Sequence, residues 1–338
     1  MKSTAIVILN WNGKTLLERF LPMLIRYTPF WEVDIIVADN GSTDDSTAFL
    51  QAQYPEIIVQ KFPVNYGFAE GYNRALIGLK HRYVVLLNSD VEVTENWFSP
   101  AIQYLNEHPE VSAIQPKILS YYNRSLFEYA GACGGFIDRN GYPFCKGRVI
   151  NTLEKDNGQY NSVNPIFWAS GACLFIRLET YKSLGGFDEN FFAHQEEIDL
   201  CWRLNARGHR IVSFPQSTVY HLGGATLKKE NPQKTYLNFR NNLLMIYKNM
   251  PKKDCRRALK NRLLWDYLSA CNFLLKGQIR NAMAIFRARL HFRLLKSKYK
   301  AIRKYNLSLT QIPQPETMLQ KSLIWEYYFG RKKRFSDL

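Results

Sequence analysis

The chain has 338 residues, of which 46% are hydrophobic, so it is long enough and apolar enough to bury a full core. Its net charge of +16 is uneven: residues 228–338 hold 26 Lys and Arg against 6 Asp and Glu, whereas residues 1–227 hold 19 against 23. No stretch reaches the roughly 18 apolar residues of a spanning helix, and the start resembles no cleaved signal. We therefore expect a cytosolic protein with reduced cysteines, not an integral membrane or secreted one.

Apolar runs and helical periodicities alternate along the first part of the chain. Strands are predicted at residues 4–9, 33–38, 57–61 and 83–87, and helices at residues 14–27, 68–80 and 96–108. Alternation at this spacing predicts a parallel, doubly wound sheet. The run at residues 83–87 is apolar throughout, which is typical of a strand buried on both faces.

The second half of the chain is less regular. Residues 111–119 predict a strand, and Pro116 within it indicates an edge or irregular strand. Residues 121–165 are rich in Gly, Asn and Tyr without clear periodicity, which is typical of a lid or binding loop. Further elements are predicted as strands within residues 166–177 and 211–220 and a helix at 200–207.

Residues 236–305 are helical in pattern and basic. Apolar residues recur at helical spacing on both sides of Gly277, which predicts a helical hairpin. This stripe comprises Leu259, Leu263, Leu264, Leu268, Cys271, Ile279, Met283, Phe286 and Leu290. Two interpretations remain open: the hairpin packs on the preceding domain, or it lies in a lipid interface.

Carboxylates follow two of the buried strands. Asp39 follows the second strand, and Asp90 and Glu92 follow the fourth. Open α/β sheets bind ligands beyond the carboxyl ends of their strands. Asp90 and Glu92 offer hard oxygen ligands for a divalent cation that could hold a pyrophosphate, although a capping role for Asp90 is the simpler alternative. The chain contains neither a P-loop nor a dinucleotide-binding glycine motif.

Several motifs resemble, in order and spacing, those of family 2 glycosyltransferases with the GT-A fold, in particular the rhamnosyltransferase-like branch. The resemblance covers about residues 3–250, and its specificity comes from the number of pieces in order. The pieces are Ile6-Val7-Ile8-Leu9-Asn10-Trp11-Asn12, Val37-Ala38-Asp39-Asn40-Gly41-Ser42, Asn65-Tyr66-Gly67-Phe68, Leu87-Asn88-Ser89-Asp90, Gly185-Gly186-Phe187-Asp188, Glu196-Glu197-Ile198-Asp199 and Val219-Tyr220-His221-Leu222-Gly223-Gly224.

The resemblance implies a role for each matching residue. Asn88, Ser89 and Asp90 stand at the D-x-D motif, with Asn in place of the first Asp, so Asp90 would hold Mg²⁺ or Mn²⁺ on the donor diphosphate. His221 would add a further metal ligand, or else be a structural histidine at a strand end. The donor nucleoside would contact Asp39, in a pocket that the resemblance also lines with Asn10, Asn12, Asn65, Gly67 and Asn73.

The acidic run falls on the family's second acidic motif, which supplies the general base. The resemblance places Glu197 in that role, and Glu196 or Asp199 could serve instead because Glu is one methylene longer than the usual Asp. An acid-rich helix start is the structural alternative for the same residues.

Together these points predict a GT-A-type α/β domain at residues 1–235, with a donor half at about 1–115 and an acceptor half at about 116–235, followed by a basic helical region at 236–338. The predicted activity is inverting, metal-dependent transfer from a nucleotide-diphosphate sugar to a glycan or lipid-linked acceptor in cell-surface polysaccharide synthesis. The basic region predicts a peripheral position on the anionic inner face of a membrane.

Two other functions use the same features. A sugar-phosphate nucleotidyltransferase would also place carboxylates at this sheet edge, but it normally carries a glycine-rich, basic loop after its first strand. A nucleic-acid-binding protein would use the basic tail. The tail lacks an aromatic-stacking or groove-reading motif, so we expect no nucleic-acid partner.

Overall fold

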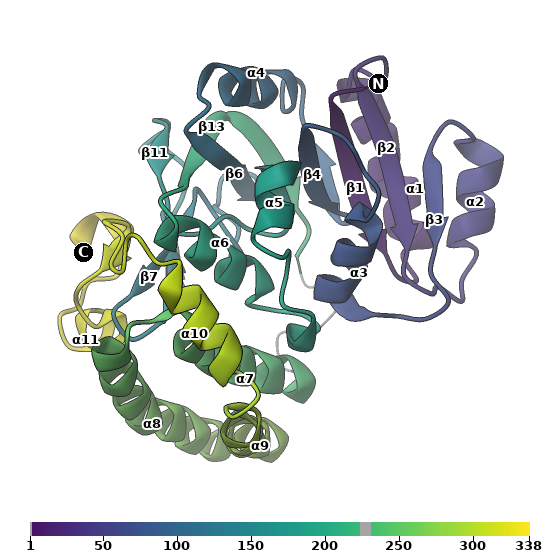
Figure 1. The fold of residues 1–338 in the computed structure, drawn as a ribbon. Helices are drawn as coiled ribbons and strands as arrows, with labels where there is room; N and C mark the ends of the chain where they lie inside the picture. Colours follow the sequence, from purple (N-terminus) through teal and green to yellow (C-terminus); the bar gives the residue numbers. More distant parts are fainter. Residues whose placement is uncertain (1, 224–230) are drawn as a thin grey trace.

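The computed structural model describes residues 2–223 and 231–338, and Gly224 of the last motif lies outside them (Figure 1). A nine-stranded sheet runs through the described part in the order β11-β13-β6-β12-β4-β1-β2-β3, with β5 paired to β13. Its strands are β1 (Thr4–Asn10), β2 (Val33–Asp39), β3 (Ile58–Lys61), β4 (Tyr83–Asn88), β5 (Val91–Val93), β6 (Val111–Ser120), β11 (Asn164–Pro165), β12 (Cys173–Arg177) and β13 (Arg210–His221).

Strands β3, β2, β1 and β4 are parallel, as predicted. They are joined through α1 (Lys14–Tyr27), α2 (Ser46–Gln53) and α3 (Gly67–Leu76). Asn10 pairs in register with Asp39, and Leu9 pairs with Asn88, so β1, β2 and β4 end at the same level. The polar residues that follow these strands therefore meet at one edge of the sheet.

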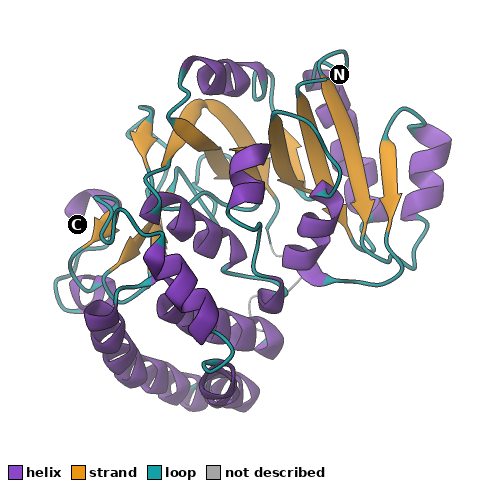
Figure 2. Ribbon diagram, in the orientation of Figure 1, coloured by secondary structure: helices purple, strands orange, loops and turns teal. Residues whose placement is uncertain are grey.

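Both faces of the sheet are covered by helices (Figures 1 and 2). Along β4, Val84 and Leu86 belong to one apolar core, and Val85 and Leu87 belong to the other. This alternation follows from the two-residue period of a strand, and it confirms that β4 is buried on both faces. Residues of α1 and of α4 (Ser99–Glu107) fill the second core, whereas α3, α5 (Leu178–Ser183) and α6 (Glu196–Ala206) contribute to the first.

Strand β6 is not an edge strand, because it lies between β13 and β12. It is irregular, as Pro116 indicates: the pairing with β13 shifts register between Phe214, opposite Pro116, and Thr218, opposite Lys117. Proline has no N–H to donate to the ladder, so a bulge in the neighbouring strand accommodates it within the sheet.

Residues 121–165, predicted to form a lid or binding loop, are more regular than expected. Four short strands of this segment and β14 from the end of the chain form a second sheet, ordered β10-β9-β8-β7-β14. Its strands are β7 (Gly135–Asp138), β8 (Pro143–Cys145), β9 (Arg148–Val149), β10 (Thr152–Leu153) and β14 (Met318–Leu319). Ile137, Phe144 and Val149 are buried within it. Strands of two to four residues are too short to show a period, so the sequence pattern did not reveal them.

The chain ends in helices that wrap around the domain (Figure 2). They are α7 (Pro232–Asn249), α8 (Lys252–Leu275), α9 (Ile279–Leu295), α10 (Lys300–Ser308) and α11 (Leu323–Tyr328), with short turns η1 (Glu189–Phe191) and η2 (Phe335–Asp337) elsewhere. The predicted hairpin is confirmed: Gly277, with φ of +70°, lies between α8 and α9. Among the described residues, no helix combines the length and apolar character needed to cross a bilayer.

Candidate active site

The loops after β1 and β2 are held together by side-chain hydrogen bonds. Asn10 Nδ2 donates to Asp39 Oδ1 at 3.1 Å and to Ser42 Oγ at 3.3 Å, while the Ser42 N–H donates to Asp39 Oδ2 at 3.1 Å. Asn12 Oδ1 accepts from the Thr43 N–H at 2.7 Å. The structure thus brings Asn10, Asn12 and Asp39 together at the end of the parallel strands, as predicted for three of the donor-pocket residues.

One hydrogen-bond acceptor in this cluster has no partner within the protein. Asn10 Oδ1 is buried and has no hydrogen-bond partner. A Cβ on Gly13 would come within 2.4 Å of it, so only glycine leaves that oxygen accessible from the Gly13 side. A buried acceptor without a partner is costly in a finished core, which is why such groups are often found in ligand sites.

Asn65 and Gly67 lie beside the same loops. Asn40, which follows Asp39, donates from Nδ2 to Asn65 Oδ1 at 3.1 Å and to the Gly67 carbonyl at 3.0 Å. Gly67 has φ of +78°, and a Cβ there would meet the Phe192 ring at 2.5 Å. Asn40 therefore links the loop after β2 to Asn65 and Gly67. The sequence analysis gave it no role, although it lies in the same motif as Asp39.

Asn73 is placed differently from the other predicted donor-pocket residues. Its Nδ2 donates to the Phe187 carbonyl at 2.9 Å, and its Oδ1 accepts from Tyr181 Oη at 2.6 Å and from the Phe187 N–H at 2.9 Å. These contacts join α3 to the turn that precedes α6. Asn73 thus holds the segment that carries the acidic run.

Asp90 and His221 form a buried pair. Asp90 Oδ1 lies 3.1 Å from His221 Nε2, and Glu128 Oε2 lies 3.4 Å from the other ring nitrogen of His221. Burial alone would raise the pKa of Asp90, but the charge and hydrogen bond of His221 hold it below its ordinary value. Burial would lower the pKa of His221, yet the charge of Asp90 and the hydrogen bonds raise it to about 10. Sequence reasoning missed Glu128, for which the sequence offers no local signal.

Glu92 does not join this pair. It accepts from Arg124 Nη2 at 2.7 Å, and Arg124 lies over the Tyr220 ring at 4.2 Å from its centroid. Within residues 2–223 and 231–338, no group of three or more His, Cys, Asp or Glu side chains is arranged to hold a metal ion. Asn88 is the last residue of β4, Ser89 separates it from Asp90, and the Asn88 side chain hydrogen-bonds Asp90.

Asp199 is fully engaged in the protein interior. Its Oδ2 pairs with Lys248 Nζ at 3.0 Å and with Arg203 Nε at 3.1 Å, and its Oδ1 accepts from Asn249 Nδ2 at 2.7 Å. Burial raises the pKa of Asp199, but Lys248 and Arg203 outweigh burial and lower it overall. All partners of Asp199 favour a structural role.

Glu196 and Glu197 open α6 and differ from Asp199. Each has one buried carboxylate oxygen without a hydrogen-bond partner. Burial raises the pKa of Glu197 to about 7, and burial together with the charge of Glu197 raises the pKa of Glu196 well above its ordinary value. The helix begins at Glu196, earlier than predicted, so the acids occupy its first turn.

Glu197 lies at the same edge of the sheet as the residues after β4. A Cβ on Gly171 would be 3.9 Å from Glu197 Cβ. Gly171 precedes Ala172, whose carbonyl accepts from the Asn88 N–H at 3.0 Å. Tyr72 connects the same region: its hydroxyl donates to the Leu87 carbonyl at 3.1 Å, and its pKa, raised chiefly by burial, is also raised by Asp90 and Glu196.

The loop before Glu196 has an unusual backbone. Phe192, His194 and Gln195 have φ of 64°, 71° and 74°, a region that costs non-glycine residues energy. Asn241 of α7 secures this loop, because its Nδ2 contacts the carbonyls of Phe191 at 2.9 Å, Ala193 at 3.0 Å and His194 at 2.8 Å.

Sequence reasoning also missed the part that α7 plays. A usable signal was present: Asn241, Asn242, Lys248 and Asn249 are polar residues that flank the apolar run at residues 243–247 within a single helix. Polar groups in such a setting indicate buried hydrogen-bond partners.

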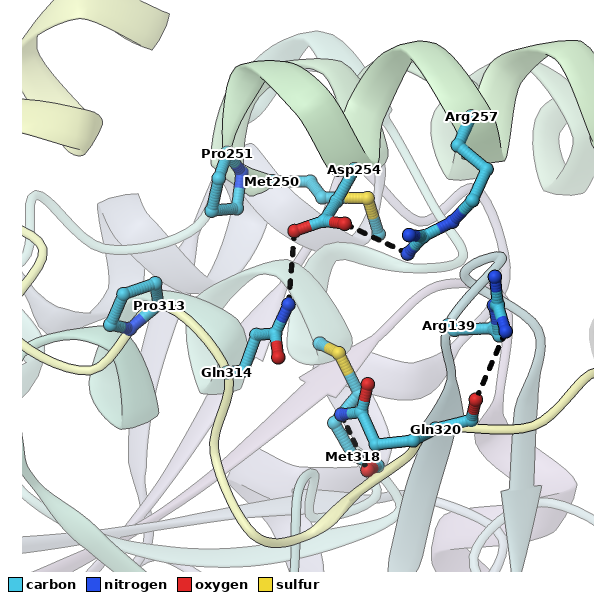
Figure 3. A pocket seen from close by; sticks show the side chains of 9 residues that line it. All are labelled: Arg139, Met250, Pro251, Asp254, Arg257, Pro313, Gln314, Met318 and Gln320. Carbon is cyan, nitrogen blue, oxygen red and sulfur yellow. Dashed lines mark hydrogen bonds and ion pairs between the residues drawn. The ribbon is translucent and has the colours of Figure 1, made fainter.

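The pocket in Figure 3 is separate from these residues. It is small and lies where the chain after α10 crosses the start of α8. Asp254 pairs there with Arg257 at 2.8 Å and accepts from Gln314 Nε2 at 3.0 Å. None of the predicted site residues lines it, so it plays no part in the candidate site.

A mixed sheet of this order, with polar residues gathered at the carboxyl ends of β1, β2 and β4, is the GT-A fold of nucleotide-sugar glycosyltransferases. The family comparison agrees: residues 2–236 match the model described as "Glycosyltransferase like family 2". The chain belongs to this family and is a glycosyltransferase, which decides against the nucleotidyltransferase alternative.

Individual relatives are distant. The chain is 27% identical over 232 residues to an N-acetylglucosaminyl-diphospho-decaprenol L-rhamnosyltransferase of Mycobacterium tuberculosis, covering 64% of this chain and 75% of the relative. Its fold is similar to that of GalNAc-T7 with UDP, GalNAc and Mn²⁺, with a TM-score of 0.60 at 15% identity, covering 98% of this chain and 57% of the other. The mannosyltransferase PcManGT of Pyrobaculum calidifontis, with GDP-Man and Mn²⁺, has a TM-score of 0.53 at 13% identity, covering 91% of this chain and 86% of the other.

Proposed function

We propose that the protein is an inverting, metal-dependent glycosyltransferase that moves a sugar from a nucleotide diphosphate to a glycan or lipid-linked acceptor in cell-surface polysaccharide synthesis. One observation carries the proposal. The Asp90–His221 pair and the unpartnered carboxylate oxygen of Glu197 lie at the same edge of the sheet, beyond the ends of parallel strands. A transferase needs these two functions side by side, one for the departing diphosphate and one for the acceptor.

The donor nucleoside binds in the loops after β1 and β2. Asp39 is buried at the end of β2 and is oriented by Asn10 and Ser42, so it accepts hydrogen bonds from the base or ribose. Asn10 Oδ1 is a second acceptor without a protein partner. Asn65 and Gly67 shape the neighbouring wall through Asn40.

Asp90 and His221 would hold the metal. Metal binding would displace the proton that His221 Nε2 shares with Asp90, and the carboxylate oxygen and imidazole nitrogen would then offer a mixed donor set, which suits Mn²⁺ better than Mg²⁺ because Mg²⁺ prefers oxygen alone. Glu128 beside the second ring nitrogen orients the histidine, as carboxylates commonly do behind metal-bound imidazoles. Two protein ligands leave coordination positions for the diphosphate, whose charge the cation would neutralise.

Glu197 removes the proton from the acceptor hydroxyl. Its raised pKa, near 7 through burial, matches a base that works at neutral pH. Asp199 is held by Lys248, Arg203 and Asn249 and has no free oxygen for this task. Glu196 is the nearest alternative base, because burial and the charge of Glu197 raise its pKa as well and one of its carboxylate oxygens also lacks a partner.

The acceptor is a glycan or a lipid-linked sugar, and the enzyme works peripherally on the inner, anionic face of a membrane. The mycobacterial relative is named for a diphospho-decaprenol acceptor, which is a membrane lipid. The basic charge of this chain lies in its carboxyl-terminal third, which suits an anionic surface.

A donor screen tests the proposal. The protein is incubated with UDP-, dTDP- and GDP-sugars in Mn²⁺ with a polyprenyl-diphosphate-linked sugar as acceptor, and release of nucleoside diphosphate is measured. One donor class should support release that depends on acceptor and metal and that yields a product with inverted anomeric configuration. Release that is unchanged in EDTA, or a retained configuration, would contradict the mechanism.

A further inference from the structure

The helical hairpin of α8 and α9 has its apolar side facing outward. Its exposed apolar residues, which we call the hairpin stripe, include Leu275 at 88%, Ile279 at 63% and Met283 at 60% relative exposure. The complete hairpin stripe is Leu263, Leu264, Leu268, Leu274, Leu275, Ile279, Met283, Phe286, Leu290 and Leu294. The predicted apolar periodicity is therefore real, but most of it does not serve the core.

The inward side of α8 is small and polar instead. Asp266 is fully buried and pairs with Arg262 Nε at 3.0 Å and with Arg289 Nη1 at 2.5 Å. Cys255, Ala258 and Ala270 complete the inward side of α8, whereas α9 buries Ile285 and Phe292. The ion pairs fix how the two helices are rotated about their axes, so the hairpin stripe cannot turn inward without leaving Asp266 unpaired.

The parts of the hairpin stripe on α8 and α9 form one surface. Tyr267 and Phe286 bring their rings to 5.5 Å between centroids, across the junction of the two helices. In Figure 1 the strand β2 points toward the lower edge of the molecule, and α8 and α9 lie along that edge. The hairpin is therefore on the side of the molecule toward which the parallel strands point.

The surroundings of the hairpin stripe are basic. Residues 252–304 hold 16 Lys and Arg and 2 Asp and Glu. Neither acid is free, because Asp254 pairs with Arg257 and Asp266 is buried between two arginines. Exposed cations flank the hairpin stripe at Lys253, Arg256, Lys260, Arg280 and Arg293.

We propose that the hairpin stripe and its flanking cations are the surface by which the protein docks on an anionic lipid bilayer, with α8 and α9 lying in the plane of the headgroups. Apolar side chains flanked by Lys and Arg are the composition that interfacial helices use. A second copy of the chain is the other possible occupant, but pairing this surface with itself would bring cations against cations. This proposal rests on the proposed membrane partner and adds the surface that contacts it. Vesicle binding is measured without any sugar transfer, so its result is distinct from a test of the proposed activity.

Vesicle sedimentation of the full chain tests the proposal. The protein should bind vesicles that contain phosphatidylglycerol and should bind phosphatidylcholine vesicles much less, and raising the salt from about 0.05 to about 0.5 M should weaken binding. The fourfold variant Leu268→Gln, Leu275→Gln, Met283→Gln and Leu290→Gln should reduce binding by about tenfold or more. A triple variant of Lys253, Arg256 and Lys260 to Gln should also reduce it by about tenfold or more.

Matched controls alter exposed residues outside the hairpin. Trp31→Gln with Ile77→Gln removes exposed apolar side chains, and Lys61→Gln with Lys80→Gln removes exposed cations. Both controls should bind as the parent does. Equal binding to neutral vesicles, no vesicle binding, or full binding by the fourfold variant would overturn the proposal. A dimer in solution that the fourfold variant converts to a monomer would assign the surface to a second copy.

Discussion

Asp90 Oδ1 lies 3.1 Å from His221 Nε2, a contact that joins the turn after β4 to the end of β13. If this pair holds the metal on the donor diphosphate, Asp90→Ala should abolish Mn²⁺-dependent binding of the nucleotide sugar in calorimetry, and His221→Ala should weaken it by about 10 to 100-fold. Glu92→Gln is the matched control, because Glu92 pairs with Arg124 instead. Donor affinity that EDTA leaves unchanged would contradict this assignment.

The network around Asp199 should support stability rather than chemistry. Asp199→Asn leaves the buried Arg203 without its anion, whereas Lys248 keeps Asp188 at 2.6 Å, so we expect a loss of about 3 kcal/mol in the free energy of unfolding. Urea unfolding measures this loss. The prediction fails if Asp199→Asn is as stable as the parent protein and yet inactive, since that pattern would give Asp199 a chemical role.

Asn241 should act as a positioning residue for Glu197. Asn241→Leu removes the contacts to the carbonyls of Phe191, Ala193 and His194, and the strained loop before Glu196 would relax. We expect kcat to fall by about tenfold to a hundredfold with a smaller change in donor Kd, because this loop leads directly into Glu196 and Glu197 but touches the donor pocket only through Phe192 beside Gly67. Asn238→Leu, on the same helix, removes one weaker contact of 3.3 Å to Gln195 and is the control. Equal effects of the two substitutions would argue against the assignment.

Glu197 should reduce stability at alkaline pH. Burial raises its pKa to about 7, so the folded state holds this proton more tightly than the unfolded state does. The contribution of protonated Glu197 to the free energy of unfolding is therefore fully present below about pH 4.5, and it is lost as the pH rises through about 7. Glu197→Gln should be more stable than the parent by about 1–2 kcal/mol near pH 8 and similar near pH 5. Thermal unfolding at both pH values checks this, and a variant less stable near pH 8 would contradict it.

Much of the donor half could be predicted from the sequence because its signals are local. The helix at Lys14–Tyr27 has its predicted bounds, and the apolar strands β1, β2 and β4 end where polar residues begin. Those ends bring Asn10, Asp39 and Asp90 to one edge of the sheet, because parallel strands share a direction.

Other features depend on contacts between distant parts of the chain. Three contacts join elements that are far apart in sequence, so no local period could predict them. They are Glu128 with His221, Lys248 with Asp199, and Asn241 with the loop before α6. The hairpin stripe shows a different limit. Its period predicted helices correctly, but which side faces inward was decided by the buried pairing of Asp266 with Arg262 and Arg289.

The central claim is that Glu197 is the general base, and the transfer rate of Glu197→Gln tests it most directly. Gln keeps the size and hydrogen bonding of the side chain but cannot accept the proton. The measurement compares turnover and donor affinity of Glu197→Gln with those of Glu196→Gln and Asp199→Asn, together with the pH profile of the parent protein. The parent's kcat/KM should rise with pH through about 7, since Glu197 must be ionised to act. Glu197→Gln should bind donor normally and transfer sugar at least about a hundredfold more slowly. Retention of most of its turnover by Glu197→Gln would contradict the account.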